Sequence, residues 1–400
     1  MKKIKGFVPN QYIADTRNTI FTVLLKHAML ENKSLQDLKK KSYVHGLLKY
    51  PPRWSKSTDI FKFIDKRAIK SMRKKETFFI FDASTEGFCP IDEIPFFDML
   101  YYNCHIYNID PQMVMYVSAN LKDEDNIEYY AKTHNVKPMK VFSFPSFEQV
   151  LAVDNNKAEE VVEIQYQKAL EGCKNDHNDK FFSSLSRINR EYRTLATFML
   201  CQDSIASRGL ISHDKVRNWN SIAAHPQLSE YTSKQAKKWI KSLPRVVDRN
   251  DFGNNWAINT PYDQIFNKTL FQIVNETSVN DFNNKSLFYS EKSFRPIGQF
   301  QPFVLYSQRN ANQALQTLGY KTYDGWFDLS FDSISDPIER YKELLKSVKE
   351  TVKHLESMSK EQRVEWRFKD PQLLKHNFNI MISSERSKQK LLMFMESLCT

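Results

Sequence analysis

Short apolar runs separated by polar and helical stretches dominate the chain from residue 76 onward. Five of these runs lie at Thr77–Phe81, Met113–Val117, Val141–Phe144, Phe271–Val274 and Pro302–Tyr306. Continuous apolar runs of this length are typical of strands that are buried on both faces, as in parallel sheets. The pattern predicts an α/β fold in which the first three runs form one Rossmann-like domain and the last two belong to a second.

Other segments carry apolar residues at helical spacing instead. Residues 11–30 and 57–73 have this spacing, and Ile338, Tyr341, Leu345, Val348, Val352 and Leu355 trace one face of a long helix after Asp336 and Pro337. The polar segment 154–180 is the expected link between domains. The predicted organisation is a basic helical lobe at 1–75 that belongs to the N-terminal domain, Rossmann-like domains at 76–175 and 176–340, and C-terminal helices at 341–400 that pack back across the domains.

Charge is concentrated at the start of the chain. Residues 1–75 contain 19 Lys and Arg against 5 Asp and Glu, a balance of +14, whereas the whole chain carries +11. The last cations of this region lie among aromatic residues and are Lys66, Arg67, Lys70, Arg73, Lys74 and Lys75. This mixture is typical of a nucleic-acid-binding surface. A solvated basic face above buried aromatics, or attraction to an anionic membrane surface, would account for the same pattern.

Composition excludes several common classes of enzyme. The 9 glycines are so spread that neither a dinucleotide-binding G-x-G-x-x-G motif nor a phosphate-binding G-x-x-x-x-G-K loop is present. Histidine spacing suggests no metal site, and the 5 cysteines form no C-x-x-C pair, which fits reduced thiols. Because no apolar stretch approaches the length of a membrane span, we expect a soluble cytoplasmic protein. A phosphate ligand would have to be held by side chains and helix ends.

The segment from Ser290 to Pro296 places a carboxylate and two cations between two predicted strands. A carboxylate such as Glu291 can accept hydrogen bonds from both hydroxyls of a ribose, while Lys292 and Arg295 can neutralise phosphate oxygens. Ser290 as a helix N-cap would add the positive end of the helix dipole. The alternative is an exposed first helical turn in which Glu291 only complements the dipole.

Three further groups are candidates for the same ligand or for catalysis. Glu276 follows the run Phe271–Val274 and would open onto the carboxyl-end crevice, or else serve in a turn. Arg187 and Arg190, with Arg193, fall three residues apart, which on a helix places them along one side, where they would bind a diphosphate or pair with nearby acids.

Two carboxylates follow the first predicted strand. Glu86 is the preferred general base for activating an acceptor hydroxyl, followed by Asp82 and then Asp92. The alternative is that Asp82 and Glu86 cap the turn after the strand.

Parts of the sequence resemble phage-encoded glycosyltransferase-like proteins of the two-domain type. The resemblance is carried by the segments 185–193, 271–277, 287–297, 301–303 and 318–323, and the pair Glu291–Lys292 is similar to the donor-binding element of fucosyltransferases. Ser290 stands where fucosyltransferases usually carry Thr, and Arg295 where the phage relatives often carry Lys. The resemblance implies two Rossmann-like domains facing a cleft, in a GT-B-like arrangement, with the glutamate at the ribose and the cations at the diphosphate.

The resemblance also implies a reaction. The expected enzyme transfers a sugar from a nucleoside-diphosphate sugar, with a UDP-sugar as the first candidate, to an acceptor hydroxyl and needs no metal or further cofactor. Phage context, in an infected host cytoplasm, favours a hydroxymethylated base of modified DNA as the acceptor, flipped out of its stack. A saccharide or lipid-linked acceptor is the next candidate. A non-catalytic nucleic-acid-binding protein is the competing class.

Overall fold

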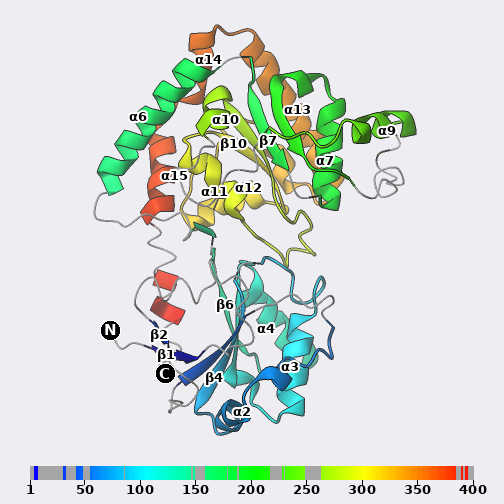
Figure 1. Ribbon diagram of the computed structural model, residues 1–400, viewed down its shortest axis with the longest axis vertical. Helices are drawn as coiled ribbons and strands as arrows, with labels where there is room; N and C mark the ends of the chain where they lie inside the picture. Colours follow the sequence, from blue (N-terminus) through cyan, green and yellow to red (C-terminus); the bar gives the residue numbers. More distant parts are fainter. Residues whose placement is uncertain are drawn as a thin grey trace. The chain divides into compact units, whose positions relative to one another are not determined.

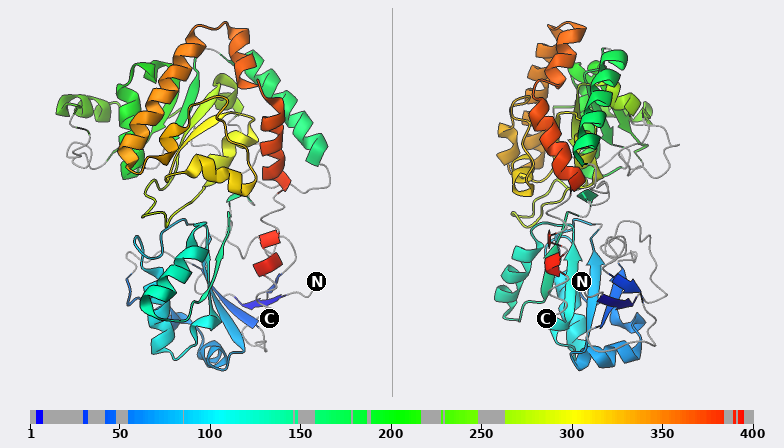
Figure 2. Two further views of the ribbon diagram at one scale, coloured as in Figure 1. Left: turned by 180° about the vertical axis from the view of Figure 1, so that it is seen from behind. Right: turned by 90° about the vertical axis from the view of Figure 1, so that its left-hand side faces the viewer.

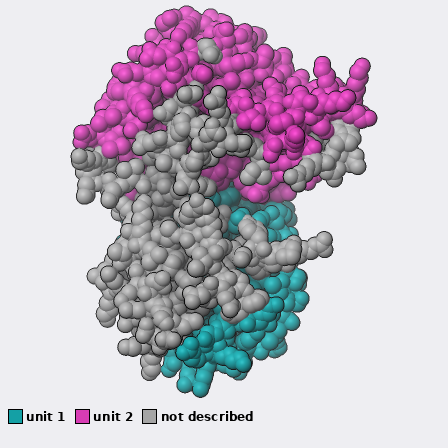
Figure 3. Space-filling model, viewed as in Figure 1, with its two compact units in different colours: residues 1–150, 281–288, 385–400 teal, residues 151–280, 289–384 magenta. Residues whose placement is uncertain are grey.

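The computed structural model divides the chain into two compact units. Unit 1 contains residues 1–150, 281–288 and 385–400, and unit 2 contains residues 151–280 and 289–384 (Figure 3). The residues that the structure describes are 4–7, 30–32, 42–47, 55–84, 86–145, 147–148, 158–177, 179–186, 189–216, 228, 230–247, 263–383, 389–390 and 392–394.

Unit 1 is built on a parallel sheet of six strands in the order β2-β1-β3-β4-β5-β6. These strands are β1 (Ile4–Phe7), β2 (Leu30–Asn32), β3 (Ser42–Leu47), β4 (Thr77–Ala83), β5 (Val114–Ser118) and β6 (Lys140–Ser143) (Figure 1). Every residue of β5 is buried, as its uninterrupted apolar sequence predicts. The strands predicted near residues 77, 113 and 141 are therefore confirmed with small shifts of their ends.

Three helices accompany this sheet: α2 (Lys66–Arg73), α3 (Phe96–Ile106) and α4 (Asp123–His134). Asp65 caps α2 through its side chain, which accepts a hydrogen bond from the backbone N–H of Arg67. The core between the helices and the sheet is rich in aromatic rings. Phe61 packs edge-on against Phe79 with ring centroids 5.0 Å apart. Apolar side chains of α2 and α3 thus bury one face of the sheet.

Unit 2 is built on a second parallel sheet, of four strands in the order β10-β9-β7-β8. The strands are β7 (Phe182–Ser186), β8 (Gly209–His213), β9 (Phe271–Asn275) and β10 (Phe303–Tyr306). The helices are α6 (Ala158–Asp176), α7 (Glu191–Gln202), α9 (Ser233–Lys241), α10 (Asp263–Lys268), α11 (Glu291–Gly298), α12 (Ala311–Ala314), α13 (Pro337–Glu356), α14 (Lys360–Arg367) and α15 (Pro371–Ser383).

The helices of unit 2 form two packed groups. One consists of α6, α10, α14 and α15, with α11 against α15, and the other pairs α13 with α7 and α7 with α9 (Figure 2). Because all residues of β9 and β10 are buried, this sheet is covered on both faces, as parallel sheets require. The amphipathic helix predicted after Asp336 is confirmed as α13, which Asp336 caps by accepting from the backbone N–H groups of Ile338 and Glu339.

The strand order of unit 2 contains a reversal that positions the candidate site. From β7 the chain moves outward to β8, then returns past β7 to β9 and continues to β10 on the other side. In open parallel sheets ligands bind outside the carboxyl ends of the strands at such a switch point. In unit 2 that point lies between the ends of β7 and β9.

The N-terminal part of the chain differs from its prediction. Residues 1–75 were expected to form a helical lobe, but they contribute β1, β2 and β3 to the same sheet as β4. The predicted helix at 57–73 is shortened to a 3-10 turn at Phe61–Phe63 followed by α2. The predicted helix at 11–30 lies outside the described residues, apart from Leu30 in β2. β3 lies between the two predicted helices, in a stretch for which no strand was predicted, and it pairs in parallel with β4.

The domain boundaries also differ. Most of the expected link at 154–180 is the 19-residue helix α6, which belongs to unit 2, so the boundary at residues 175 and 176 is replaced by one at 150 and 151. Residues 341–400, expected as helices packing back across the domains, are divided: the part up to 384 belongs to unit 2 and the part from 385 to unit 1. The α/β class with parallel sheets stands. No helix among the described residues is long and apolar enough to cross a membrane.

Candidate functional site

The candidate site lies in unit 2 where β9 ends and α11 begins. Glu276 follows directly on the last residue of β9, and Glu291 and Lys292 are the first two residues of α11. Ser290 is the N-cap of α11, and its hydroxyl accepts from the backbone N–H of Lys292 at 3.3 Å. The cap predicted from the sequence is therefore confirmed. It directs the first-turn N–H groups of an eight-residue helix toward the carboxyl edge of the sheet.

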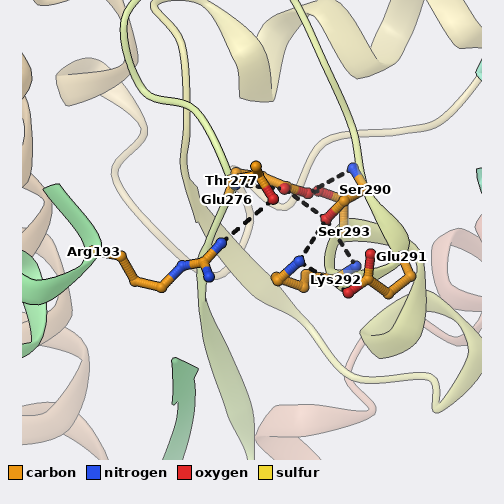
Figure 4. A network of polar contacts seen from close by, with 7 residues as sticks. All are labelled: Arg193, Glu276, Thr277, Ser290, Glu291, Lys292 and Ser293. Atoms are coloured by element: carbon orange, nitrogen blue, oxygen red, sulfur yellow. Dashed lines mark hydrogen bonds and ion pairs between the residues drawn. The ribbon is translucent and has the colours of Figure 1, made fainter. Parts of the chain in front are cut away.

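Glu276 holds the beginning of α11 in place. One carboxylate oxygen accepts from the backbone N–H of Ser290 at 2.9 Å and from the hydroxyl of Ser293 at 2.6 Å. The other accepts from the hydroxyl of Ser290 at 2.6 Å and from the backbone N–H of Thr277 at 2.9 Å (Figure 4). Glu276 is 1% exposed. Because its carboxylate already accepts four hydrogen bonds, Glu276 orients the start of α11 and does not contact a ligand directly. This is the turn role that the sequence allowed as the alternative.

Glu291 and Lys292 form an ion pair at the start of α11. The Lys292 ammonium lies 2.9 Å from a Glu291 carboxylate oxygen and also donates to the Ser290 hydroxyl at 3.1 Å. The two side chains are only 15% and 19% exposed. Burial by itself would raise the pKa of Glu291, but the charges of Lys292 and Arg295 outweigh it and lower that pKa to about 2. The alternative of an exposed first turn does not fit these exposures, and the site contains a partly buried carboxylate, ionised at neutral pH, beside two cations.

Arg193 joins the site from α7. Its guanidinium points toward Thr277, whose hydroxyl oxygen lies 3.4 Å from Nη2 (Figure 4). Arg193 is 3% exposed, and burial lowers its pKa, whereas the carboxylates of Glu276 and Glu291 oppose that shift. Its charge is thus added to those of Lys292 and Arg295. In the sequence, Arg193 stands out only as the third of three arginines spaced three residues apart.

The other two arginines of that series occupy different positions. Arg190 is the exposed N-cap residue of α7, and the helix begins only at Glu191, so Arg190 and Arg193 do not share one helical face. Arg187 lies outside the described residues. The spacing of three residues therefore predicted a helix that already contains Arg187 and Arg190, whereas α7 begins at Glu191. The sequence signal that came nearest to the observed site was the predicted strand Phe271–Val274 followed by a helix capped by Ser290, since the two meet at the carboxyl edge of the sheet.

Neutral polar side chains surround this charged group at the same edge of the sheet. Asn275, the last residue of β9, donates to the hydroxyls of Ser184 and Ser186 in β7 at 3.1 and 2.9 Å. His213, which ends β8, is fully buried, and burial lowers its pKa. The ends of three strands thus carry polar residues, as expected of a switch point that accepts a polar ligand.

The predicted catalytic carboxylates lie in unit 1. Asp82 is inside β4, one residue before its end, and is 2% exposed. Its carboxylate accepts from the backbone N–H of Ser84 at 2.9 Å, so it caps the turn after the strand. Glu86 is half-buried, beyond the end of β4. Asp92 forms an ion pair with Lys285 at 2.8 Å. Of these three, Asp82 takes the structural role left open above.

The basic residues on and after α2 separate into two sets. Arg67 pairs with Asp65 at 3.1 Å, Lys75 pairs with Asp110 at 2.6 Å, and Arg73 donates to the Tyr107 carbonyl at 2.6 Å. Lys66, Lys70 and Lys74 are exposed and make no ion pair with any described residue. They are four residues apart, which at 1.5 Å per residue is a spacing of about 6 Å on one side of the helix. We call these three residues the lysine row.

A cavity of about 670 Å³ is present elsewhere in unit 2, between α6 and α14. Its lining includes Tyr166, Leu170, Val364 and Phe368, with Lys174, Lys360 and Lys369 among the charged residues. None of the predicted site residues lines it. In the part of the chain that is described, no group of three or more His, Cys, Asp or Glu side chains could hold a metal ion.

The chain has no match to a known family. No protein-family model matches it, and no curated protein has a significantly similar sequence.

Proposed function

We propose that the protein is a glycosyltransferase that uses a nucleoside-diphosphate sugar and binds this donor in unit 2. The observation that carries the proposal is the ionised, partly buried Glu291 beside Lys292, at a helix N-terminus and at the switch point of a parallel sheet. A ribose diol needs an acceptor, and a diphosphate needs cations and N–H donors.

In this proposal each group has a distinct task. Glu291 accepts from the ribose hydroxyls, and Lys292 moves its ammonium from the carboxylate to a phosphate oxygen as the donor binds. Arg295 and Arg193 add positive charge, which stabilises the leaving diphosphate as the bond to the sugar breaks. Glu276 keeps α11 in position and does not touch the donor. Metal-independent transfer is consistent with this charge balance, and a UDP-sugar is the first candidate donor.

We assign the acceptor to unit 1, in the GT-B-like division of labour. Glu86 is the remaining candidate for the base that removes a proton from the acceptor hydroxyl, since Asp82 is occupied by its turn. The lysine row favours a polyanionic acceptor, so a hydroxymethylated base of modified DNA stays the first choice and a saccharide or lipid-linked acceptor the second. The same row supports the alternative of a nucleic-acid-binding protein without catalysis.

Calorimetry with UDP-glucose and a panel of other nucleoside-diphosphate sugars tests the donor site. We expect one donor class to bind and the Glu291→Ala variant to bind it at least about tenfold more weakly, because a charged hydrogen-bond acceptor is lost. The matched control is Glu339→Ala, which removes a first-turn glutamate of α13 that is paired with Lys342 at 3.2 Å. If no member of the panel binds the wild-type protein, the glycosyltransferase proposal is wrong and the binding-protein alternative gains.

A further inference from the structure

The loop between β9 and α11 leaves unit 2 and returns to it. Residues 281–288, which we call the strap, belong to unit 1, whereas the residues on either side belong to unit 2. Only residues 277–280 separate Glu276 from the strap, and only Tyr289 separates the strap from Ser290. Glu276 and Ser290 therefore flank, in sequence, a segment that belongs to the other unit.

Two asparagines of unit 1 hold the strap by its backbone. The Lys285 carbonyl accepts from the side-chain amides of Asn120 at 3.0 Å and of Asn126 at 2.8 Å. The Asn120 carbonyl oxygen in turn accepts from the backbone N–H of Leu287 at 2.9 Å, and the Leu287 carbonyl accepts from the backbone N–H of Leu121 at 2.8 Å. Both asparagines are almost fully buried, with exposures of 0% and 3%. Loss of these amides would remove the partners of the part-buried Lys285 carbonyl and of the buried Leu287 N–H.

Asp123 orients both asparagines. A single oxygen of its carboxyl group accepts from Asn120 at 2.7 Å and from Asn126 at 2.8 Å. Asp123 is the first residue of α4 and is fully buried. The three side chains form one rigid polar cluster at the carboxyl end of β5, because each amide is fixed by an acceptor on either side.

Side chains of the strap add further contacts in unit 1. Phe288 lies so close to Gly87 that a β-carbon there would be 2.1 Å from its ring. The Ser286 hydroxyl donates to the Gly87 carbonyl at 3.3 Å, and the Lys285 ammonium pairs with Asp92 at 2.8 Å. The strap is therefore fitted into unit 1 by backbone, packing and charge together.

The chain is also fixed on the unit 2 side of each crossing. The Val279 carbonyl accepts from Arg340 at 2.7 Å, and the Tyr289 hydroxyl donates to the Ala311 carbonyl at 2.6 Å. On the two sides of the strap, the chain passes from one unit to the other between residues 280 and 281 and between residues 288 and 289.

We propose that Asn120 and Asn126 are positioning residues for the candidate site, because they fix the strap that connects Glu276 to Ser290 along the chain. They touch neither donor nor acceptor. This inference rests on the proposed function for its consequence, which is that a perturbation of the strap in unit 1 changes the affinity of unit 2 for the nucleotide. The geometric part, the coupling of the strap to Glu276 and Ser290, holds independently of which ligand binds.

Hydrogen exchange in the full-length protein tests the geometric part. In the Asn120→Ala/Asn126→Ala double variant, the amides of Thr277 and Ser290, which donate to Glu276, should exchange about tenfold faster than in the wild type. Amides of β9 and β10 should not change. The matched control is Asn103→Ala, a fully buried asparagine of unit 1 that holds the carbonyl of Thr58 at 2.8 Å and no part of the strap. Faster exchange confined to residues 285–287 would overturn the proposal.

A second measurement gives the functional part. The dissociation constant for UDP should rise about threefold or more in the double variant and stay at the wild-type value in Asn103→Ala. If the double variant does not fold, Asn126→Ala alone, which leaves Asn120 on the Lys285 carbonyl, decides by the same two readouts with smaller changes. Absence of UDP binding to the wild type would refute the proposed nucleotide site, while the exchange result would still decide whether the strap is coupled to it. Equal UDP affinity in wild type and double variant would overturn the positioning role.

Discussion

The carboxyl edges of the two parallel sheets differ in what occupies them. In unit 1 the ends of β4 and β5 receive the strap, and the polar residues there are neutral amides around Asp123, whose pKa burial raises well above its usual value. In unit 2 the ends of β7 and β9 gather ions, among them Glu291, whose pKa is about 2 although burial opposes its ionisation. The carboxyl edge of the sheet in unit 1 is occupied by the strap, whereas that of the sheet in unit 2 carries a cluster of charged side chains.

The difference shows that architecture alone does not identify a ligand site. Both sheets are parallel, and both have polar residues after their strands, as expected at carboxyl edges. In unit 1 these residues satisfy backbone groups of another segment, which is a structural use. In unit 2 three cations, Arg193, Lys292 and Arg295, accompany two carboxylates, Glu276 and Glu291, and this concentration of charge suits an anionic ligand. The comparison can be tested by four sets of variants.

The largest effect is expected at Glu276. Replacement by Ala removes the acceptor of four hydrogen bonds and a buried counter-charge of Arg193, so we expect a loss of about 3–5 kcal/mol in the free energy of unfolding. Urea unfolding at neutral pH measures it. Glu343→Ala, which breaks a surface ion pair of α13 with Lys346, is the control and should cost less than about 1 kcal/mol. Equal losses in the two variants would show that the charged edge is not a built network.

The next effect is the acid dependence of the charged edge. The pKa of Glu291 is lowered from 4.5 to about 2, so its ionised form favours the folded state above pH 4.5 and this contribution is lost as pH falls toward 2. It amounts to on the order of 3 kcal/mol. Glu291→Gln should therefore lose less stability than the wild type over this range. An unfolding series by pH, with Glu339→Gln as control, measures the difference, and parallel curves would contradict a depressed pKa.

The neutral edge should respond to pH in the opposite direction. Burial raises the pKa of Asp123 above 3.8, so the protonated form favours the folded state and stability is lost as pH rises above 3.8 toward the folded pKa. Asp123→Asn keeps the oxygen that accepts from Asn120 and Asn126 but cannot ionise. We expect it to be more stable than the wild type at pH 7 by about 1 kcal/mol, and to lack this decline. The prediction is refuted if the stability of Asp123→Asn, measured as its difference from the wild type, falls between pH 4 and pH 7.

The smallest effect is expected from the lysine row. Replacing Lys66, Lys70 and Lys74 by Gln should weaken binding to duplex DNA and reduce the slope of log affinity against log salt by about 3. Fluorescence anisotropy at several salt concentrations measures both quantities.

The control removes the same net charge from cations that already have partners. These cations are Arg67, Arg73 and Lys75, whose replacement by Gln should change the salt slope less. Equal slopes for the two triple variants would mean that net charge alone matters, and an unchanged affinity in both would remove DNA from the proposed acceptors.

Much of the local structure could be predicted from the sequence. Buried strands were recognised by their apolar runs, and the Ser290 cap, the neighbouring Glu291–Lys292 pair and the helix after Asp336 depend only on residues within a turn of one another. Such features follow from local backbone geometry, which spacing encodes. The strands β1, β2 and β3 were not recognised, because they are short and are stabilised by pairing with one another and with β4, which lies far along the chain.

Contacts between distant segments were decided by the tertiary structure. The sequence by itself determined the α/β class and the charges available at the start of α11. Three features were decided only by the fold. Arg193, and not the exposed Arg190, is buried near Glu276 and Glu291. The Glu276 carboxylate accepts four hydrogen bonds, and residues 281–288 belong to unit 1. The physical reason is that strand order and chain crossings determine which side chains meet, and these depend on packing across the whole chain and not on the spacing within any one segment.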